Sequence, residues 1–239
     1  MFTVQQATPE VSKPQQTSRN LESLLTEFKD LFDNTKLTPI HNIKAHLHVE
    51  PDAQYKIFKP RPVPYALRSK IETEFERLVG LGIISKVSTA EFSTTIVPFL
   101  KPNGQVRICG DFKITVNCYL YHTQYSLPHI EEIFERLSGV AVYSKLDLPD
   151  AYLQVELDEE SKRHAVITTH KGLYRYNRLC FRIAAAPAIV QGIIKQILQH
   201  VKKVQPFLDD IALKEKNDQE TIFRFCCTPL APSNMQESN

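Results

Sequence analysis

The sequence predicts an α+β fold, in which helices and antiparallel strands occupy separate stretches of the chain. Apolar residues recur at helical spacing in several segments, and from residue 140 onward a two-residue period typical of strands appears. Turn residues flanked by short apolar arms also recur, which is typical of β-hairpins. Because strands and helices gather in patches, the sequence favours α+β over a regularly alternating α/β sheet.

The N-terminal quarter is expected to be mostly irregular. Residues 1–20 are rich in Gln, Thr, Ser and Pro without an apolar period, which predicts a flexible leader. Leucines and phenylalanines at helical spacing predict an amphipathic helix over residues 21–32. Residues 36–66 are rich in Pro and Lys, and this composition predicts an extended linker.

A longer helix and a hairpin are predicted after this linker. Ser69 and Glu72 have the spacing of a capping box, and Gly80 is placed to end the helix. Alternation over residues 96–109, around the turn Pro102-Asn103-Gly104, predicts a β-hairpin. The buried stripe of the helix is expected to consist of Ile71, Phe75, Leu78 and Val79.

The remaining elements follow from the same two periods. The last hairpin contains Pro206, which either weakens its first arm or places that arm at a sheet edge, because proline cannot donate a ladder hydrogen bond. Helices are expected over residues 130–137 and from Pro187 to Val201, and strands over 142–146, 152–157, the hairpin 165–176 and the hairpin 204–213.

Composition excludes several classes of protein. Of the 239 residues, 42% are hydrophobic and 23% are charged, as in an ordinary globular protein, and only seven are glycine, which argues against a Gly-rich phosphate loop. The five cysteines include no Cys-X-X-Cys pair, which argues against a disulfide framework and a zinc site. No segment approaches the ~20 apolar residues of a membrane helix, and no signal peptide is recognisable. We therefore expect neither membrane insertion nor secretion.

Three aspartates form the most informative pattern. Asp147 ends an apolar strand, and Asp209 and Asp210 lie at the tip of the last hairpin. If the two strands are neighbours in one sheet, the three carboxylates converge and need cations, because crowded carboxylates repel one another. Magnesium prefers oxygen ligands, and two such ions can stabilise both reacting oxygens of a phosphoryl transfer. Spacing alone leaves a second interpretation open, in which the pair is a solvated turn and Asp147 a strand-end cap.

An ordered series of motifs across residues 24–213 resembles the reverse transcriptase of long-terminal-repeat retrotransposons of the Ty3/Gypsy type. The resemblance implies the fingers and most of the palm of a right-hand polymerase, with an antiparallel palm sheet backed by helices and no thumb. It also implies an RNA-directed DNA polymerase cut from a Pol polyprotein. The motifs, in chain order, are Val97-Pro98-Phe99, Lys101-Pro102-Asn103-Gly104, Val106-Arg107-Ile108-Cys109-Gly110-Asp111-Phe112-Lys113, Tyr125-Ser126-Leu127-Pro128, Tyr143-Ser144-Lys145-Leu146-Asp147-Leu148, Asp150-Ala151-Tyr152-Leu153-Gln154, Lys171-Gly172-Leu173-Tyr174-Arg175-Tyr176-Asn177-Arg178-Leu179 and Phe207-Leu208-Asp209-Asp210.

The resemblance assigns roles to the residues of these motifs and their neighbours. The resemblance implies that the catalytic residues are Asp147, Asp209 and Asp210. The same three residues would bind two Mg²⁺ ions, for which Mn²⁺ can substitute. The implied nucleotide-binding residues are Lys101, Arg107, Asp150, Ala151, Tyr152, Phe181 and Gln191. Arginine offers a planar fork and lysine a mobile charge, so both suit a triphosphate. The resemblance also implies that the Tyr152 ring lies beneath the sugar, where it would exclude a 2′-hydroxyl by its bulk. From the residues alone, Lys101 and Arg107 are also compatible with solvated surface positions, and Tyr152 and Phe181 with ordinary packing.

The implied partners are deoxynucleoside triphosphates and an RNA or DNA template–primer. Residues 56–113 carry ten Lys or Arg against five Asp or Glu, and this local excess favours contact with a nucleic-acid backbone. The expected organisation is a leader over 1–20, an N-terminal helix and linker over 21–66, fingers and palm over 67–213, and an unmatched, disordered tail over 214–239.

Five positions depart from the family pattern. Cys180-Phe181-Arg182 stands where the family has Pro-Phe-Gly, and a long cation there is expected to block the pocket or distort the turn. Val190 and Phe207 replace a phenylalanine and a tyrosine, and Pro149 replaces a small residue. With these departures and no thumb, we expect the isolated chain to be weakly active or inactive. Two alternatives are a non-catalytic nucleic-acid-binding remnant and a decayed product that does not fold stably.

Overall fold

The computed structural model describes residues 26, 37–54, 56–121, 130–139, 142–148, 150–201 and 204–215. The chain divides into two compact units. The first unit takes residues 126–149 and 191–239 together with 1–36, and the second unit takes residues 37–125 and 150–190. The leader, the helix over 21–32 apart from Thr26, and the tail from residue 216 lie outside the described residues.

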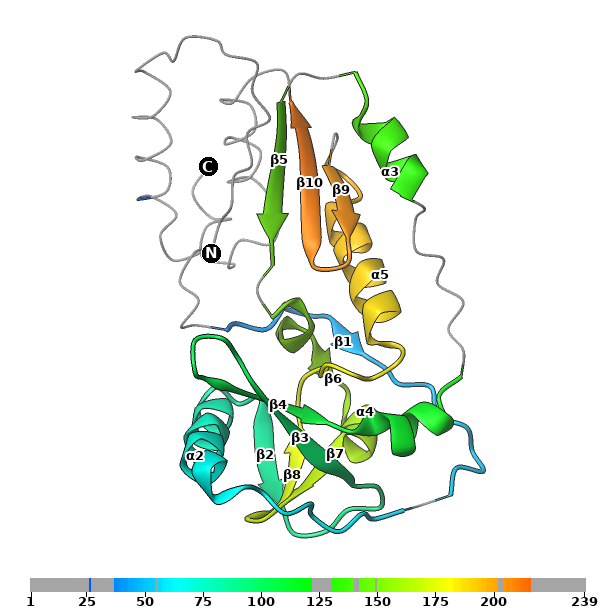
Figure 1. The fold of residues 1–239 in the computed structure, drawn as a ribbon. Coiled ribbons are helices and arrows are strands. Elements are labelled where there is room, and N and C mark those ends of the chain that lie inside the picture. The colour runs from blue at the N-terminus through cyan, green and yellow to red at the C-terminus, as the bar shows by residue number, and fades with distance from the viewer. Residues whose placement is uncertain are drawn as a thin grey trace. The chain divides into compact units, whose positions relative to one another are not determined.

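The first unit contains an antiparallel sheet of three strands in the order β5-β10-β9 (Figure 1). The strands are β5 (Val142–Asp147), β9 (Val204–Phe207) and β10 (Asp210–Glu215), and the helices are α3 (Ile130–Leu137) and the part of α5 (Ala186–Leu198) from Gln191 onward. Ile211 and Leu213 of β10 are buried, as are Ile193, Ile194 and Leu198 of α5. The antiparallel sheet, both helices and the edge position of β9 confirm the sequence predictions for these segments.

The second unit is built on a five-stranded sheet in the order β2-β8-β7-β3-β4. Its β3 and β7 are parallel, and the other neighbours are antiparallel. The strands are β2 (Ile84–Val87), β3 (Thr94–Leu100), β4 (Val106–Gly110), β7 (Val166–Thr169) and β8 (Gly172–Tyr176). A separate parallel pair joins β1 (Lys44–Ala45) to β6 (Glu156–Leu157). Both predicted hairpins, β3–β4 and β7–β8, are confirmed.

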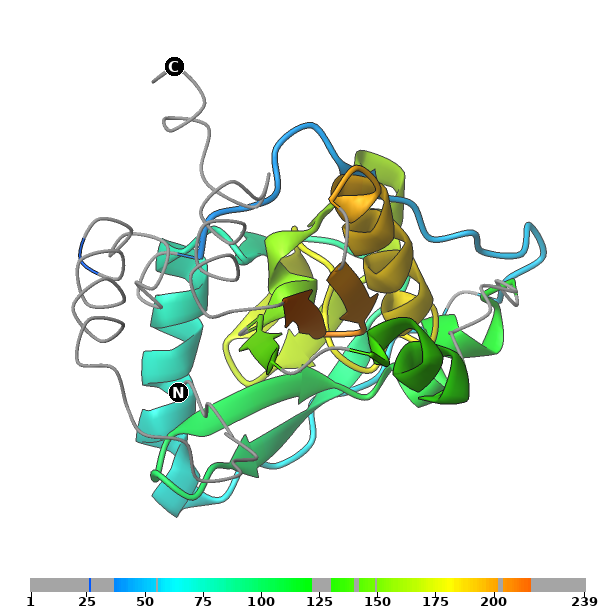
Figure 2. The ribbon, with the colours of Figure 1, turned by 90° about the horizontal axis from the view of Figure 1, so that it is seen from above.

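Helix α2 (Tyr65–Gly80) packs on this sheet through its buried stripe. Ile71 and Leu78 are buried, and the ring of Phe75 stacks on Tyr174 of β8 with 5.1 Å between centroids. Val79, predicted to belong to the stripe, is instead 45% exposed. Figure 2 shows the long β3–β4 hairpin beside α2, and a 3.1 Å hydrogen bond from Lys70 Nζ to the Gly104 carbonyl joins them. None of the described helices is long and apolar enough to cross a membrane.

Two further local predictions were wrong. The helix begins at Tyr65, four residues before the predicted capping box, and no side chain caps it. The N-cap is Pro64 with φ −54°, and proline's fixed φ starts a helix without a capping side chain. The predicted strand over 152–157 is a 3₁₀ turn, Ala151–Gln154, followed by the short β6. The alternating apolar residues that suggested a strand, Leu153, Val155 and Leu157, are nevertheless all buried.

Candidate active site

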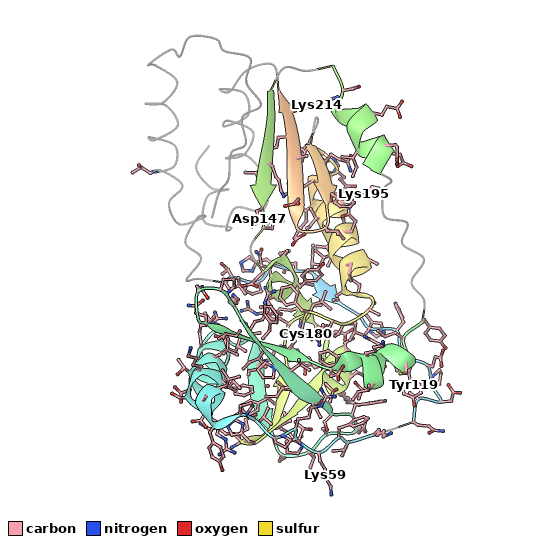
Figure 3. All side chains as sticks on the ribbon, in the orientation of Figure 1. Lys59, Tyr119, Asp147, Cys180, Lys195 and Lys214 are labelled. Atoms are coloured by element: carbon pink, nitrogen blue, oxygen red, sulfur yellow. The ribbon has the colours of Figure 1, made fainter. Side chains whose placement is uncertain are left out.

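The three aspartates meet at one end of the three-stranded sheet in the first unit. Asp147, the last residue of β5, is the register partner of Asp210, the first residue of β10. Asp209 lies in the turn just before β10, and its carbonyl accepts a 2.8 Å hydrogen bond from the Leu148 amide. Figure 3 shows Asp147 at the end of its strand. The predicted approach of these residues is confirmed, whereas their catalytic role stays a prediction.

Lys145 is a further member of this acidic group. Its ammonium lies 2.8 Å from Oδ2 of Asp210. The hydrogen bond to Asp210 raises the pKa of Lys145, burial opposes this increase, and the negative charges of Asp210, Asp147 and Asp209 add to it. All three carboxylates therefore act on one cation. Sequence reasoning missed this residue, although its position two residues before Asp147 places both on one face of β5.

The acidic group has the donor chemistry of a divalent-cation site. Its carboxylate oxygens are the ligands that magnesium and manganese prefer. Within the described part of the chain, however, no three His, Cys, Asp or Glu side chains are arranged as a formed metal site. Lys145 supplies the compensating positive charge instead. The residues present thus fit divalent cations by their chemistry, and an ion bound here would compete with Lys145 for Asp210.

Gln191 of α5 holds the hairpin that carries two of the aspartates. Its side chain is 1% exposed, its Nε2 donates to the Pro206 carbonyl at 3.0 Å, and its Oε1 accepts from the Leu208 amide at 2.6 Å. Leu208 has φ 55°, a conformation that is costly for a side chain with a Cβ. The amide of Gln191 therefore stabilises a strained turn directly before Asp209.

A second group of predicted residues lies together in the second unit. Arg107 Nη2 lies 2.9 Å from Asp150 Oδ1, and the Arg107 guanidinium carbon lies 4.1 Å from the centroid of the Phe181 ring. Phe181 also contacts Tyr152, with ring centroids 4.9 Å apart. Lys101 lines the same small cavity of about 30 Å³ as Arg107, Asp150 and Phe181. Ala151, next to Asp150, is buried.

The same cavity contains two residues that sequence reasoning missed. Glu74 and Arg77 of α2 line it, and they form two hydrogen bonds of 2.8 Å with each other. The bond to Glu74 raises the pKa of Arg77 against the opposing effect of burial, and the charges of Glu74 and Asp150 add to the increase. Their spacing of three residues places them on one helix face, which was the available signal. This spacing did not indicate which residues that helix face would contact.

Arg182 occupies the backbone conformation of a glycine. Its φ is 73°, in the left-handed region, and its side chain is exposed. Asn117 holds this loop, because its Nδ2 donates to the Arg182 carbonyl at 2.8 Å and its Oδ1 accepts from the Ala184 amide at 2.9 Å. The chain therefore keeps the backbone turn expected of a glycine although arginine occupies the position. The left-handed conformation of Arg182 costs backbone strain.

The ten predicted residues thus fall into two sets. Asp147, Asp209, Asp210 and Gln191 belong to the first unit, and Lys101, Arg107, Asp150, Ala151, Tyr152 and Phe181 belong to the second. Gln191, predicted to line the nucleotide pocket, has its amide engaged with the acidic hairpin.

Comparison with known proteins connects these features to one family. The family model described as reverse transcriptase (RNA-dependent DNA polymerase) matches residues 99–230. The uncharacterized protein K02A2.6 of Caenorhabditis elegans is 37% identical over 88% of this chain and 17% of its own length. The retrovirus-related Pol polyprotein from transposon opus of Drosophila melanogaster is 30% identical over 93% of this chain and 23% of its own length. The chain spans about a fifth of the length of these relatives.

Solved structures share the fold. The prototype foamy virus protease-reverse transcriptase (CSH mutant) has a TM-score of 0.78 at 20% identity, covering 92% of this chain and 30% of that chain. A foamy viral protease-reverse transcriptase in complex with an RNA/DNA hybrid has a TM-score of 0.75 at 16% identity, covering 92% and 30%. These likenesses confirm the α+β fold of the fingers-and-palm type. Since the family model matches more than half of the residues, the chain belongs to the reverse transcriptase (RNA-dependent DNA polymerase) family.

Proposed function

We propose that this chain carries the nucleotidyl-transfer centre of a retrotransposon reverse transcriptase, which adds deoxynucleotides to a primer 3′-hydroxyl. The observation that carries the proposal is the register pairing of Asp147 with Asp210, with Asp209 in the adjoining turn. Reverse transcriptases generally use divalent metal ions. In this chain, the three aspartates would hold two Mg²⁺ or Mn²⁺ ions. When bound, these ions stabilise charge on the attacking and leaving oxygens.

The second-unit residues are proposed to bind the incoming nucleotide. Arg107 can present its planar fork to phosphate oxygens, and Lys101 at the start of the hairpin turn can add a mobile charge. Tyr152 packs on Phe181, and a ring fixed in this way can exclude a ribose 2′-hydroxyl by its bulk. Holding the triphosphate in a productive orientation is the main contribution that such residues make to phosphoryl transfer.

The proposed polymer partner is a template–primer duplex of RNA or DNA. One of the solved structures that share the fold is a complex with an RNA/DNA hybrid. An excess of basic residues over 56–113 supports contact with a phosphate backbone, and such contacts weaken as salt concentration rises.

Two features support weak activity for this chain on its own. Lys145 competes with cations for Asp210, and Arg182 places a long charged side chain where the family has glycine. These same features favour a second candidate, a non-catalytic nucleic-acid-binding remnant. That candidate predicts hybrid binding that survives Asp147→Asn, without any synthesis.

Primer extension on an RNA template with a DNA primer tests the proposal. We expect slow extension that requires Mg²⁺ or Mn²⁺, is lost in Asp209→Asn and is unchanged in Asp52→Asn, which alters an exposed aspartate elsewhere. Extension that persists in Asp209→Asn contradicts the proposal. Hybrid binding without extension in the native chain supports the non-catalytic candidate.

A further inference from the structure

Arg107, the proposed phosphate ligand, is already engaged by two partners in the second unit. Its Nη2 donates to Oδ1 of Asp150 at 2.9 Å, and its guanidinium carbon lies 4.1 Å over the Phe181 ring. The side chains of Arg107 and Asp150 are 38% and 31% exposed and both line the cavity, so the pair is partly accessible to a ligand. Among the described residues, Lys101 of the same cavity takes part in no ion pair.

The conformation of Asp150 leaves its carboxylate available for this contact. Asp150 precedes the 3₁₀ turn Ala151–Gln154, a position at which an aspartate normally caps the backbone amides. Here its side chain forms no capping bond, and its backbone is left-handed, with φ 51° and ψ 37°. The Asp150 carbonyl accepts the 2.8 Å bond from Leu153 that starts the turn. The carboxylate is therefore directed to Arg107 rather than to the turn.

We propose that the Asp150 carboxylate is an internal competitor of the nucleotide, occupying the Arg107 fork until a polyphosphate displaces it. This inference rests on the proposed role of Arg107 in binding triphosphate. A carboxylate and a phosphate present oxygens to guanidinium in the same way, so one excludes the other. An exposed ion pair weakens the binding of a competing anion by only about 2- to 5-fold. This factor is the same for every anion that binds the Arg107 fork, so a polyphosphate, which can also contact Lys101, still binds.

Titration calorimetry of the full chain with inorganic tripolyphosphate, at low ionic strength, tests this proposal. We expect Asp150→Asn to bind tripolyphosphate about 2- to 5-fold more tightly than the native chain. The matched control is Asp111→Asn, which breaks a similar 2.8 Å ion pair with Arg61 outside the cavity and is expected to leave the affinity unchanged. Both variants remove one negative charge, so the comparison separates competition at Arg107 from net charge.

A double variant makes the test specific to Arg107. Arg107→Met keeps an apolar stem over Phe181 and removes the guanidinium, so binding should weaken. In the Arg107→Met background, Asp150→Asn should not increase the affinity for tripolyphosphate. The competition proposal is overturned if Asp150→Asn binds no more tightly than the native chain, if Asp111→Asn gains equally, or if the gain persists with Arg107→Met. If Arg107→Met binds as well as the native chain, or if no variant binds, the proposed role of Arg107 fails and the competition proposal fails with it.

Discussion

Asp147 and Asp210 are register partners on neighbouring antiparallel strands, and the ammonium of Lys145 lies 2.8 Å from the Asp210 carboxylate. The sheet thus gathers negative charge at the end of β5 and offsets part of it with a cation from the same strand. Any divalent ion that binds the three aspartates has to compete with that cation.

Replacing Lys145 should therefore strengthen binding of divalent ions. Lys145→Gln removes the competing charge, and we expect the Kd for Mn²⁺ to fall by about 2- to 5-fold, as for the loss of one exposed ion pair. The matched control is Lys195→Gln on α5, an exposed lysine that Figure 3 labels. Mn²⁺ titrations followed by electron paramagnetic resonance give both values. Equal affinities in the native chain and Lys145→Gln would show that Lys145 does not restrict the acidic group.

Gln191 should be important for stability as well as for the turn. Gln191→Leu leaves the Leu208 amide and the Pro206 carbonyl without their buried partner, and it should cost about 1–3 kcal/mol of unfolding free energy. Gln196→Leu, an exposed position on the same helix, should stay within about 0.5 kcal/mol of the native chain. Urea unfolding measures both. A similar loss in the two variants would argue against a specific role for the Gln191 amide.

Arg182→Gly should stabilise the protein. The left-handed conformation costs a residue with a Cβ about 1–2 kcal/mol, and glycine avoids this at an entropic cost of about 0.5–1 kcal/mol. We therefore expect a net gain of up to about 1.5 kcal/mol. As a control, Arg163→Gly in the helix α4 (Glu159–His164) should lose about 1 kcal/mol, because that arginine has ordinary helical geometry. A loss of stability in Arg182→Gly, measured by thermal unfolding, contradicts backbone strain at this position.

Asp158 should make stability depend on acid pH. Burial raises its pKa, but hydrogen bonds from Ser161 and His46 outweigh this, so its pKa in the folded chain lies below the usual value. A depressed pKa means that the charged form stabilises the fold. This contribution is complete above about pH 5 and is lost as pH falls below about 4 and through the folded pKa.

Asp158→Asn separates this charge effect from helix capping. Asparagine still caps α4 by accepting from the Ser161 amide, so the variant keeps the cap and removes the titratable charge together with its pairing to His46. Urea unfolding as a function of pH should show a shallower loss of stability at acid pH in this variant, whereas Asp52→Asn should follow the native curve. Parallel curves for all three chains would assign the acid sensitivity to other groups.

The sequence predicted the elements whose signals are local. The three hairpins are encoded by a two-residue period around turn residues, and the meeting of Asp147 with Asp210 follows once β5 and β10 are neighbours. Contacts made by tertiary packing were not predictable in this way. Strand β2 has no strong period and exists because Ile84 pairs with Tyr176, far along the chain. The Gln191 amide likewise finds its partners only when α5 packs on the hairpin.

The 3₁₀ turn at 151–154 shows why a local period can mislead. Alternating burial arises from a strand, but it also arises where a tight turn passes directly into a short strand. The sequence also missed α4, whose start is encoded by a single capping aspartate, Asp158. Its six residues are too few to produce a helical apolar period.

Mn²⁺ binding by the acidic group tests the central claim most directly. In titrations followed by electron paramagnetic resonance, we expect the native chain to bind Mn²⁺, and Asp147→Asn and Asp210→Asn each to weaken binding by about tenfold or more, because each removes a full ligand charge. Asp52→Asn should bind as the native chain does. Mn²⁺ binding that is unchanged in both variants, or absent from the native chain, would contradict the assignment of these aspartates as the metal-binding centre of a polymerase.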